Sequence, residues 1–309
     1  MSADDPLAPT EVLRWNGRSF HWAARFMPAA TARDAATLYA FCRHVDDLGD
    51  GGDPAHAAPA LDAIAAALDG GAVPDAATRA FLDLARRRGI ALAAARTLVT
   101  TVRADLDAPR VPDEGALIRY AHGVAGTVGV MMCPLLGVTD ARAEPFAVDL
   151  GIAMQLTNIA RDVAEDAAAG RRYLPASWLG SDVPPQRLLD PDAATDRRVR
   201  AALDRTLATA DRYYTSAERG MRFIPARTRL AILAAARIYA AIGPRVRAAA
   251  DWRERAVVPP ARKALYSAAA MRAFAARHTR AVGPPPAHDP ALHAPIAGRV
   301  GADPAAEAG

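Results

Sequence analysis

The chain is poor in several residue types that mark particular classes of protein. Cys42 and Cys133 are its two cysteines, and neither stands in a CxxC or Cys/His spacing typical of a metal or redox site. We therefore expect both thiols to be reduced core residues. Lys263 is the one lysine among 38 basic residues, and no basic run with interleaved aromatics indicates a nucleic-acid surface. No nucleic acid is expected as a partner.

Strand-forming residues are sparse, and the first residues do not have the pattern expected of a secretory leader. Val, Ile, Thr and aromatic residues are sparse beside 77 alanines in 309 residues, which excludes an all-β fold and favours helices. Asp4 and Asp5 stand where a leader would have basic and then apolar residues, so a cytoplasmic location is expected. The segment from Tyr120 to Thr139 has no formal charge, but its four glycines and Pro134 indicate a buried core helix rather than a membrane span.

Apolar residues recur three and four positions apart along most of the chain, which predicts an all-α fold. Gly89 and the pair Gly51–Gly52 are stop signals, and Pro112 with Asp113 is a start signal. We expect one large helical bundle with a central cavity over 14–282, and disorder in 1–13 and in the Pro/Ala-rich tail 283–309. The predicted helices are 31–50, 57–68, 75–88, 91–107, 113–137, 142–168, 194–221, 226–249 and 260–280.

The first acidic helix has an apolar stripe and a polar stripe. Leu38, Phe41, Val45 and Leu48 are predicted to form the buried stripe. Tyr39, Arg43, Asp46 and Asp50 follow at offsets of four, three and four, so they share another face. Like charges at this spacing repel each other, and a bound cation would remove that cost.

The second acidic helix repeats this arrangement. Ile152, Leu156, Ile159 and Val163 are the predicted buried stripe, and the opposite face carries Gly151, Gln155, Asn158, Asp162 and Asp166, with Arg161 at its edge. Carboxylate and amide oxygens without Cys or His favour Mg²⁺ over zinc or copper. One DxxxD alone also fits the solvated face of an amphipathic helix. Two copies, each on an otherwise apolar helix, favour a site that ionises allylic diphosphates.

Several motifs together resemble one enzyme family. They are NGRSFHWAARFMP, YAFCRHVDDLGD, YAHGVAGTVG, QLTNIARDVAED followed by GRRYLP, RIYAAIG and RERAVVPPARKAL, spread from Asn16 to Leu265. The chain is similar to the squalene and phytoene synthases, which join two prenyl diphosphates head to head. Within that family, its motif sequences most resemble those of the bacterial phytoene synthases.

The resemblance implies a set of site residues. The metal ligands would be Asp46, Asp50, Asn158, Asp162 and Asp166, and the four aspartates with Tyr239 would be catalytic. The substrate-binding residues would be Ser19, Phe20, Tyr39, Arg43, Gln155, Arg161, Arg172 and Arg255.

The resemblance also implies the reaction. Two geranylgeranyl diphosphates would condense through a cyclopropyl diphosphate to phytoene, the carotenoid precursor. Two or three Mg²⁺ ions are the expected cofactors, Mn²⁺ is an alternative, and no NAD(P)H step is expected because a GxGxxG motif after a strand is absent.

Other interpretations stay open at this stage. A thirty-carbon synthase would use farnesyl diphosphate and make dehydrosqualene, presqualene diphosphate or squalene, and it would share the aspartate motifs. A head-to-tail prenyltransferase fits DDLGD but not GRRYLP, and a non-catalytic helical scaffold of the same fold would release no diphosphate. Peripheral contact between the arginine-rich 245–262 and anionic headgroups is a hypothesis. The oligomeric state is unknown, with a monomer slightly favoured.

Overall fold

The computed structural model describes residues 26–50, 54–107, 109–278 and 285–303. The part described is helical, and its one β-bridge joins Arg110 to Arg172. The α-helices are α3 (Ala29–Asp50), α4 (Pro54–Leu68), α5 (Ala76–Arg88), α6 (Leu92–Asp105), α7 (Glu114–Ala121), α8 (Thr127–Leu136), α9 (Glu144–Arg161), α10 (Val163–Ala168), α11 (Ala176–Leu179), α12 (Pro185–Leu189), α13 (Ala193–Gly220), α14 (Ala226–Ala240), α15 (Gly243–Ala248) and α16 (Pro260–His278). The π-helix is η1 (His122–Gly126), and the 3-10 helices are η2 (Ala141–Ala143), η3 (Met221–Phe223) and η4 (Pro290–Ile296).

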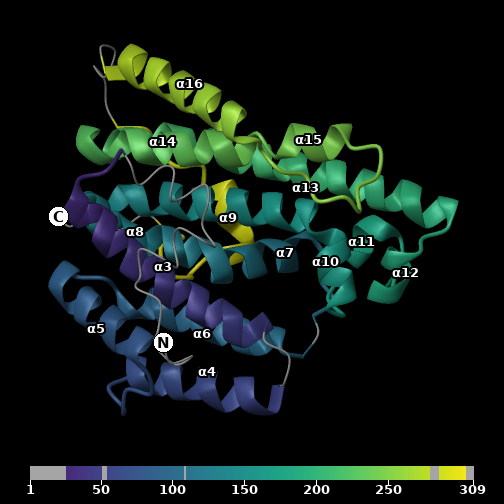
Figure 1. Ribbon diagram of the computed structural model, residues 1–309, viewed down its shortest axis with the longest axis horizontal. Helices are drawn as coiled ribbons and strands as arrows, with labels where there is room; N and C mark the ends of the chain where they lie inside the picture. Colours follow the sequence, from purple (N-terminus) through teal and green to yellow (C-terminus); the bar gives the residue numbers. More distant parts are fainter. Residues whose placement is uncertain (1–25, 51–53, 108, 279–284, 304–309) are drawn as a thin grey trace.

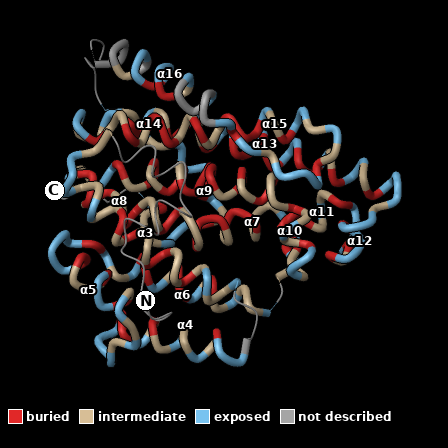
Figure 2. The backbone as a smooth tube through the Cα atoms, in the orientation of Figure 1, coloured by how far each residue is buried: buried red, intermediate tan, exposed pale blue. Residues whose placement is uncertain are grey.

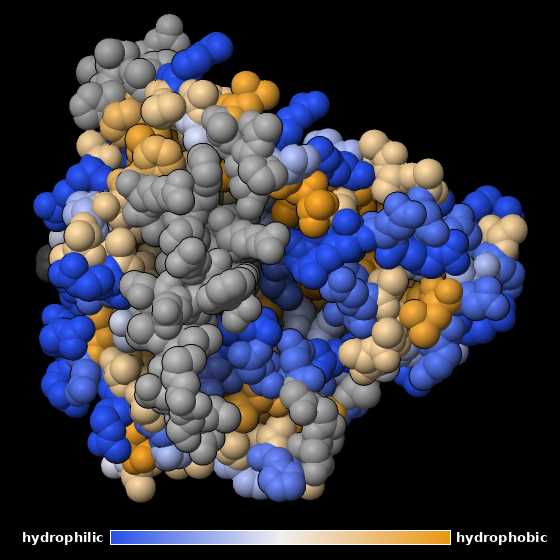
Figure 3. Space-filling view, viewed as in Figure 1, coloured by the Kyte–Doolittle hydropathy of each residue, from blue (hydrophilic) through white to orange (hydrophobic). Residues whose placement is uncertain are grey.

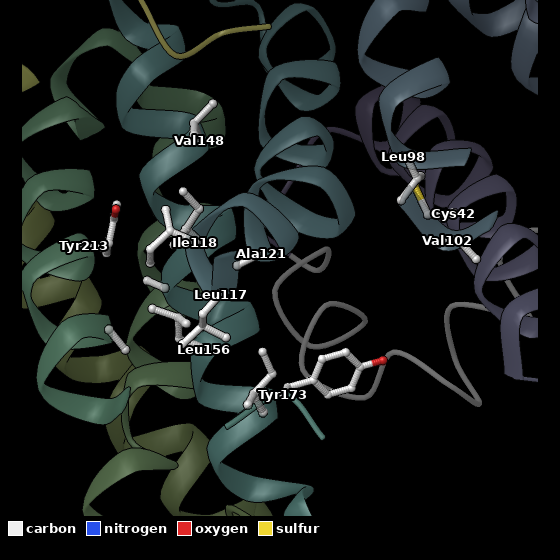
Figure 4. Close-up of a cluster of buried hydrophobic side chains, with 14 of the residues drawn as sticks. Cys42, Leu98, Val102, Leu117, Ile118, Ala121, Val148, Leu156, Tyr173 and Tyr213 are labelled. Carbon is white, nitrogen blue, oxygen red and sulfur yellow. The ribbon is translucent and has the colours of Figure 1, made fainter. Parts of the chain in front are cut away.

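Helix α9 runs through the middle of the bundle and packs against α8, α13 and α14, while α16 covers α14 on the outside (Figure 1). The predicted stripe residues Ile152, Leu156, Ile159 and Val163 are all buried, and α9 is coloured as buried along much of its length in Figure 2. Figure 4 shows part of the core, with Leu117 of α7 beside Leu156. The all-α prediction is confirmed for the described residues.

Several predicted helix ends are confirmed by their caps. The Asp113 carboxylate accepts a hydrogen bond from the Ala116 backbone N–H at 2.8 Å, as an N-cap residue does. Gly89 ends α5 in the left-handed conformation with φ of 68°. The pair Gly51–Gly52 lies outside the described residues. Cys42 and Cys133 are both buried free thiols, as expected.

The uncharged segment forms a helical run in the interior. Glu114–Leu136 is long and apolar enough to cross a membrane by length and composition, yet it packs against α6 and α9 in the bundle. Its central turn, η1, is a π-helix, a deformation that often occurs at functional sites.

Glycines bring this run into close contact with α9. A Cβ atom on Gly129 would lie 2.2 Å from the Ala147 carbonyl oxygen, and one on Gly151 would lie 2.1 Å from that of Ala125. No side chain fits either position, so the two helices approach each other more closely than alanine would permit.

The structure interrupts two of the predicted helices. The predicted helix 142–168 is broken at Asp162, whose φ and ψ of −107° and 17° separate α9 from α10. The predicted helix 226–249 ends at Ala240, and α15 begins at Gly243. The apolar spacing continues across both breaks, because one or two residues outside a helix barely disturb its periodicity.

The predicted disorder of the tail 283–309 is wrong for the described residues 285–303. Leu292, His293, Ile296 and Ala302 of this segment are buried, and the hydroxyl of Tyr213 on α13 donates to the Leu292 carbonyl at 2.6 Å. Composition alone favoured disorder, but the few apolar side chains of the segment dock on a surface that the bundle provides. The predicted disorder of 1–13 concerns residues outside the described part.

Candidate active site

An apolar cavity of about 260 Å³ lies between α3, α8, α9 and α14. A single water needs only about 10–15 Å³ of such space, so the cavity is far larger than a packing defect. Its wall is apolar along most of its length, and polar side chains gather at one end. Apolar lining residues include Ala35, Leu38, Val128, Met132, Leu136, Phe146, Leu150, Met154 and Ile232, and the polar ones are Tyr39, Asp46, Gln155, Asn158 and Tyr239.

Helix α3 brings its acidic end to the polar end of the cavity. Asp46 lines the cavity, and burial first, then the charges of Asp50, Asp47 and Asp105, raise its pKa to about 7 against the opposing charge of Arg43. A carboxyl group held this way is costly to ionise without a cation nearby. The guanidinium of Arg43 itself pairs with Asp47 on the outer side of the helix.

Helices α9 and α10 bring the second acidic motif to the same place. Burial raises the pKa of Asp166 to about 8, the charge of Asp162 adds to the shift, and the carboxylates of Asp105 and Asp50 contribute further. Asp50 belongs to α3, so the two motifs face each other and their charges interact. Figure 3 shows hydrophilic side chains around a hollow between the end of α3 and α10.

Three arginines neutralise part of this negative charge. Arg171 donates to Asp50 at 2.6 Å and to the Gly49 carbonyl at 2.7 Å. The guanidinium of Arg161 forms a two-pronged pair with Asp162 at 2.7 and 2.5 Å. Arg255 reaches Asp162 at 3.1 Å and Glu165 at 3.4 Å. The site therefore already holds cationic groups on both of its acidic sides.

The structure does not place Arg172, which the resemblance assigns to substrate binding, among the residues that line the cavity. Its side chain is 1% exposed, and its guanidinium donates to the Leu174 and Val111 carbonyls at 2.7 and 3.3 Å and to Asp182 at 2.5 Å. Adjacent residues of an extended turn point in opposite directions, so the neighbouring Arg171 faces the aspartates instead. The resemblance named Arg172 and not Arg171.

Asp105, at the end of α6, is a polar residue of this region that the sequence analysis missed. It accepts hydrogen bonds from Tyr173, and from Tyr120 at 3.2 Å, and the two rings stack with centroids 4.5 Å apart. Burial raises its pKa, while the two phenols and Arg171 oppose that shift. Asp105 continues the buried stripe of Leu98 and Val102. An acidic residue at a buried position of a helix is a sequence signal that could have identified it.

Two predicted phenols line the cavity near the carboxylates. Burial raises the pKa of Tyr39 to about 12, and the nearby Tyr239 adds to the effect. Burial also raises the pKa of Tyr239, although Arg161 opposes it. Both phenols therefore stay neutral. Ser19 and Phe20 lie outside the described residues.

The amide of Asn158 bears on whether a metal fits here. Its Nδ2 donates weakly to Gln155 Oε1 at 3.4 Å, and its Oδ1 is buried with no hydrogen-bond partner among the described residues. A buried carbonyl oxygen without a partner is costly and would be satisfied by a cation. Oxygen donors from an amide and several carboxylates fit Mg²⁺.

The donors are spread over two facing walls. Among the described residues, no three carboxylates of the acidic site have oxygens within 4.8 Å of one another. The three described side chains that do have ligand atoms this close are Asp149, His288 and His293, outside the acidic site. The acidic site thus fits ions bound separately on its two walls better than one ion shared by all the aspartates.

The all-α bundle and its apolar cavity ending in facing aspartates define a protein of the isoprenoid synthase type. The family model for squalene/phytoene synthase matches residues 13–262. A 15-cis-phytoene synthase from a Paracoccus species is 39% identical over 79% of this chain and 83% of its own length. A phytoene synthase from Pseudescherichia vulneris is 35% identical over 90% of this chain and 94% of its own. The chain belongs to the squalene/phytoene synthase family.

Solved structures show the same fold. A dehydrosqualene synthase in complex with a ligand superposes with a TM-score of 0.74 at 24% identity, covering 87% of this chain and 95% of the other. A squalene synthase from Alicyclobacillus acidocaldarius superposes with a TM-score of 0.65 at 24% identity, covering 78% and 93%.

Proposed function

We propose that this chain condenses two geranylgeranyl diphosphates head to head, through a cyclopropyl diphosphate, to phytoene. The observation that carries the proposal is one cavity with apolar walls and a polar end where Asp46, on α3, faces Asn158, on α9. A prenyl diphosphate has the same division into a long hydrocarbon and a head with several negative charges. The names of the relatives from Paracoccus and Pseudescherichia support phytoene as the product.

The proposed metal ligands are Asp46, Asp50, Asn158, Asp162 and Asp166. Bound Mg²⁺ would supply the positive charge that lets a diphosphate leave from an allylic carbon. The aspartates would hold that charge at the polar end of the cavity. The partnerless Asn158 oxygen and the raised pKa values of Asp46 and Asp166 support this assignment.

The proposed role of the arginines is to bind the diphosphate as its charge develops. Arg161, Arg171 and Arg255 surround the acidic walls, and each would exchange an aspartate partner for a phosphate oxygen. Gln155 lines the cavity beside Asn158 and would orient the head group. Arg43 pairs with Asp47. Its proposed contribution to substrate binding is indirect, because its positive charge favours the ionised form of Asp46.

The proposed role of the cavity wall is to protect carbocations from water. Apolar side chains exclude solvent, and the rings of Tyr39 and Tyr239 would stabilise a nearby cation by about 0.5–2 kcal/mol each. The Tyr239 hydroxyl, beside Arg161 and Asp162, would stay close to the departing diphosphate.

Product analysis tests this proposal. Farnesyl and geranylgeranyl diphosphate are supplied separately with Mg²⁺, with and without NADPH, and products are identified by mass spectrometry. Phytoene from geranylgeranyl diphosphate, unaffected by NADPH, is expected. A thirty-carbon product with no phytoene would establish the farnesyl alternative, and no diphosphate release from either substrate would support a non-catalytic scaffold.

A further inference from the structure

Phe146 lies at the end of the cavity away from the carboxylates. It is the third residue of α9 and lines the cavity, as does Asn158 near the other end of the helix. At 1.5 Å per residue, about 18 Å of helix axis separates the two. Leu136, the last residue of α8, and Val138 also line the cavity.

The Phe146 ring is packed on several sides away from the cavity. Its centroid is 5.8 Å from that of Phe223. A Cβ atom on Gly220 would lie 2.2 Å from the Phe146 Cβ, so α13 runs directly behind it. The imidazole of His288 meets the ring edge-on, with centroids 5.1 Å apart and planes at 78°. This aromatic contact comes from the C-terminal segment.

His288 is itself fixed by a buried carboxylate. Its Nε2 is 2.9 Å from Asp149 Oδ2, and His293 Nε2 is 2.8 Å from the other oxygen. Burial would raise the pKa of Asp149, but hydrogen bonds from the two histidines outweigh burial and lower it. Asp149 follows Phe146 by three residues on α9, so one helical turn carries both the ring and the anchor of the residue that packs on it.

The rest of the segment is fastened close by. The Arg219 guanidinium donates to the Ala287 carbonyl at 2.9 Å. The other ring nitrogen of His293 lies 2.5 Å from the Ala302 carbonyl. These contacts hold the backbone on both sides of His288, so its imidazole has a defined position rather than that of a loose tail.

We propose that His288 is a positioning residue for Phe146, and that the pair sets the length of hydrocarbon that the cavity admits. This inference rests on the proposed function, because it concerns the tail of a prenyl diphosphate whose head lies at the aspartates. A tail that extends along α9 from Asn158 meets the Phe146 ring. The ring blocks further entry only while His288 and Gly220 prevent it from moving away.

The test compares full-length variants with substrates of three lengths: farnesyl, geranylgeranyl and the twenty-five-carbon geranylfarnesyl diphosphate. Phe146→Leu lengthens the cavity at the end away from the carboxylates. We therefore expect kcat/KM for the longest substrate, relative to that for geranylgeranyl diphosphate, to rise about tenfold. His288→Gln keeps a donor for Asp149 but removes the ring, and the same ratio is expected to rise in the same direction by a smaller factor.

Two further variants separate positioning from stability. His288→Phe restores a ring beside Phe146 without the bond to Asp149, so the length preference is expected to return towards wild type while the Tm falls. His293→Gln is the matched control. His293 contacts the other oxygen of the Asp149 carboxylate, and its ring packs on that of His288. This variant is expected to lower the Tm with an unchanged preference.

The outcomes distinguish this inference from the function on which it rests. If wild type converts geranylgeranyl diphosphate but Phe146→Leu and His288→Gln keep its length preference, the inference is overturned and the proposed function stands. It is also overturned if His293→Gln shifts the preference as much as His288→Gln does. If wild type releases diphosphate from none of the three substrates, the proposed function itself fails.

Discussion

Arg171 Nη1 lies 2.6 Å from Asp50 Oδ1, although 121 residues separate them in the chain. This pair joins the turn after α10 to the end of α3 and so links the two acidic motifs. Its neighbour Arg172 is turned into the core, where it binds two carbonyls and Asp182. Adjacent arginines thus serve different purposes, one at the site and one in the fold.

Exchanging each arginine for glutamine separates these purposes. Arg171→Gln is expected to lower kcat/KM about 100-fold, because a charged donor at the diphosphate is lost, with little change in Tm. Arg172→Gln is expected to lower the free energy of unfolding by about 2–3 kcal/mol, because a buried guanidinium and its bonds to carbonyls are lost. Steady-state kinetics and urea denaturation of both variants check this, and the reverse pattern would contradict it.

The facing aspartates give a second prediction. Asp46→Asn and Asp166→Asn are each expected to lower kcat about 10²–10³-fold and to raise the Mg²⁺ concentration needed for half-maximal activity, because each removes a charge from one wall. Asp47→Asn is the control on α3, since Asp47 pairs with Arg43 and is exposed. A Mg²⁺ titration of activity that gives the three variants equal curves would remove these carboxylates from metal binding.

How far the sequence predicts this site depends on the residue. Helical spacing placed Asp46 and Asn158 on inward faces correctly because both helices are regular over that length. Arg172 was assigned from the resemblance of the GRRYLP turn and not from spacing, since a turn after a helix has no periodicity. Helical spacing did not single out Asp105 and Asp149. Both continue buried stripes, so their carboxylates need hydrogen-bond partners. Those partners, Tyr173 and His288, lie 68 and 139 residues away, and no local pattern indicates them.

Close helix packing gives a third prediction, about stability. Gly151→Ala is expected to lower the free energy of unfolding by about 1–3 kcal/mol or more, because its Cβ would lie 2.1 Å from a backbone carbonyl oxygen. Gly115→Ala is the control in α7, where the nearest atom belongs to the flexible Arg119 side chain, and it is expected to be neutral or stabilising. Equal stability of both variants in urea would contradict the close contact.

The buried carboxylate of Asp149 gives a prediction about pH. Its pKa is lower in the folded chain than its ordinary value of 3.8, so its contribution to stability is complete above the ordinary value and is lost as the pH falls through the folded value. The Asp149→Asn variant lacks this pH-dependent contribution to stability. The stability difference between wild type and this variant is therefore expected to be about 2–3 kcal/mol near neutral pH and to shrink below pH 4.

Urea denaturation of both proteins from pH 7 to pH 3 measures that difference. Hydrogen exchange of the described segment 285–303 accompanies it, since the segment is expected to exchange faster in Asp149→Asn. A difference that stays constant over the whole range would show that the Asp149 charge does not anchor the segment.

In the proposed function, carboxylates on two helices, at one end of an apolar cavity, direct a metal-dependent head-to-head condensation. Its most direct measurement is the stoichiometry of purified wild-type protein acting on geranylgeranyl diphosphate, before and after a chelator is added. We expect two diphosphates to be released for each phytoene formed, and no turnover in the chelator until Mg²⁺ is restored. Turnover that persists in the chelator, or diphosphate release without any forty-carbon product, would contradict it.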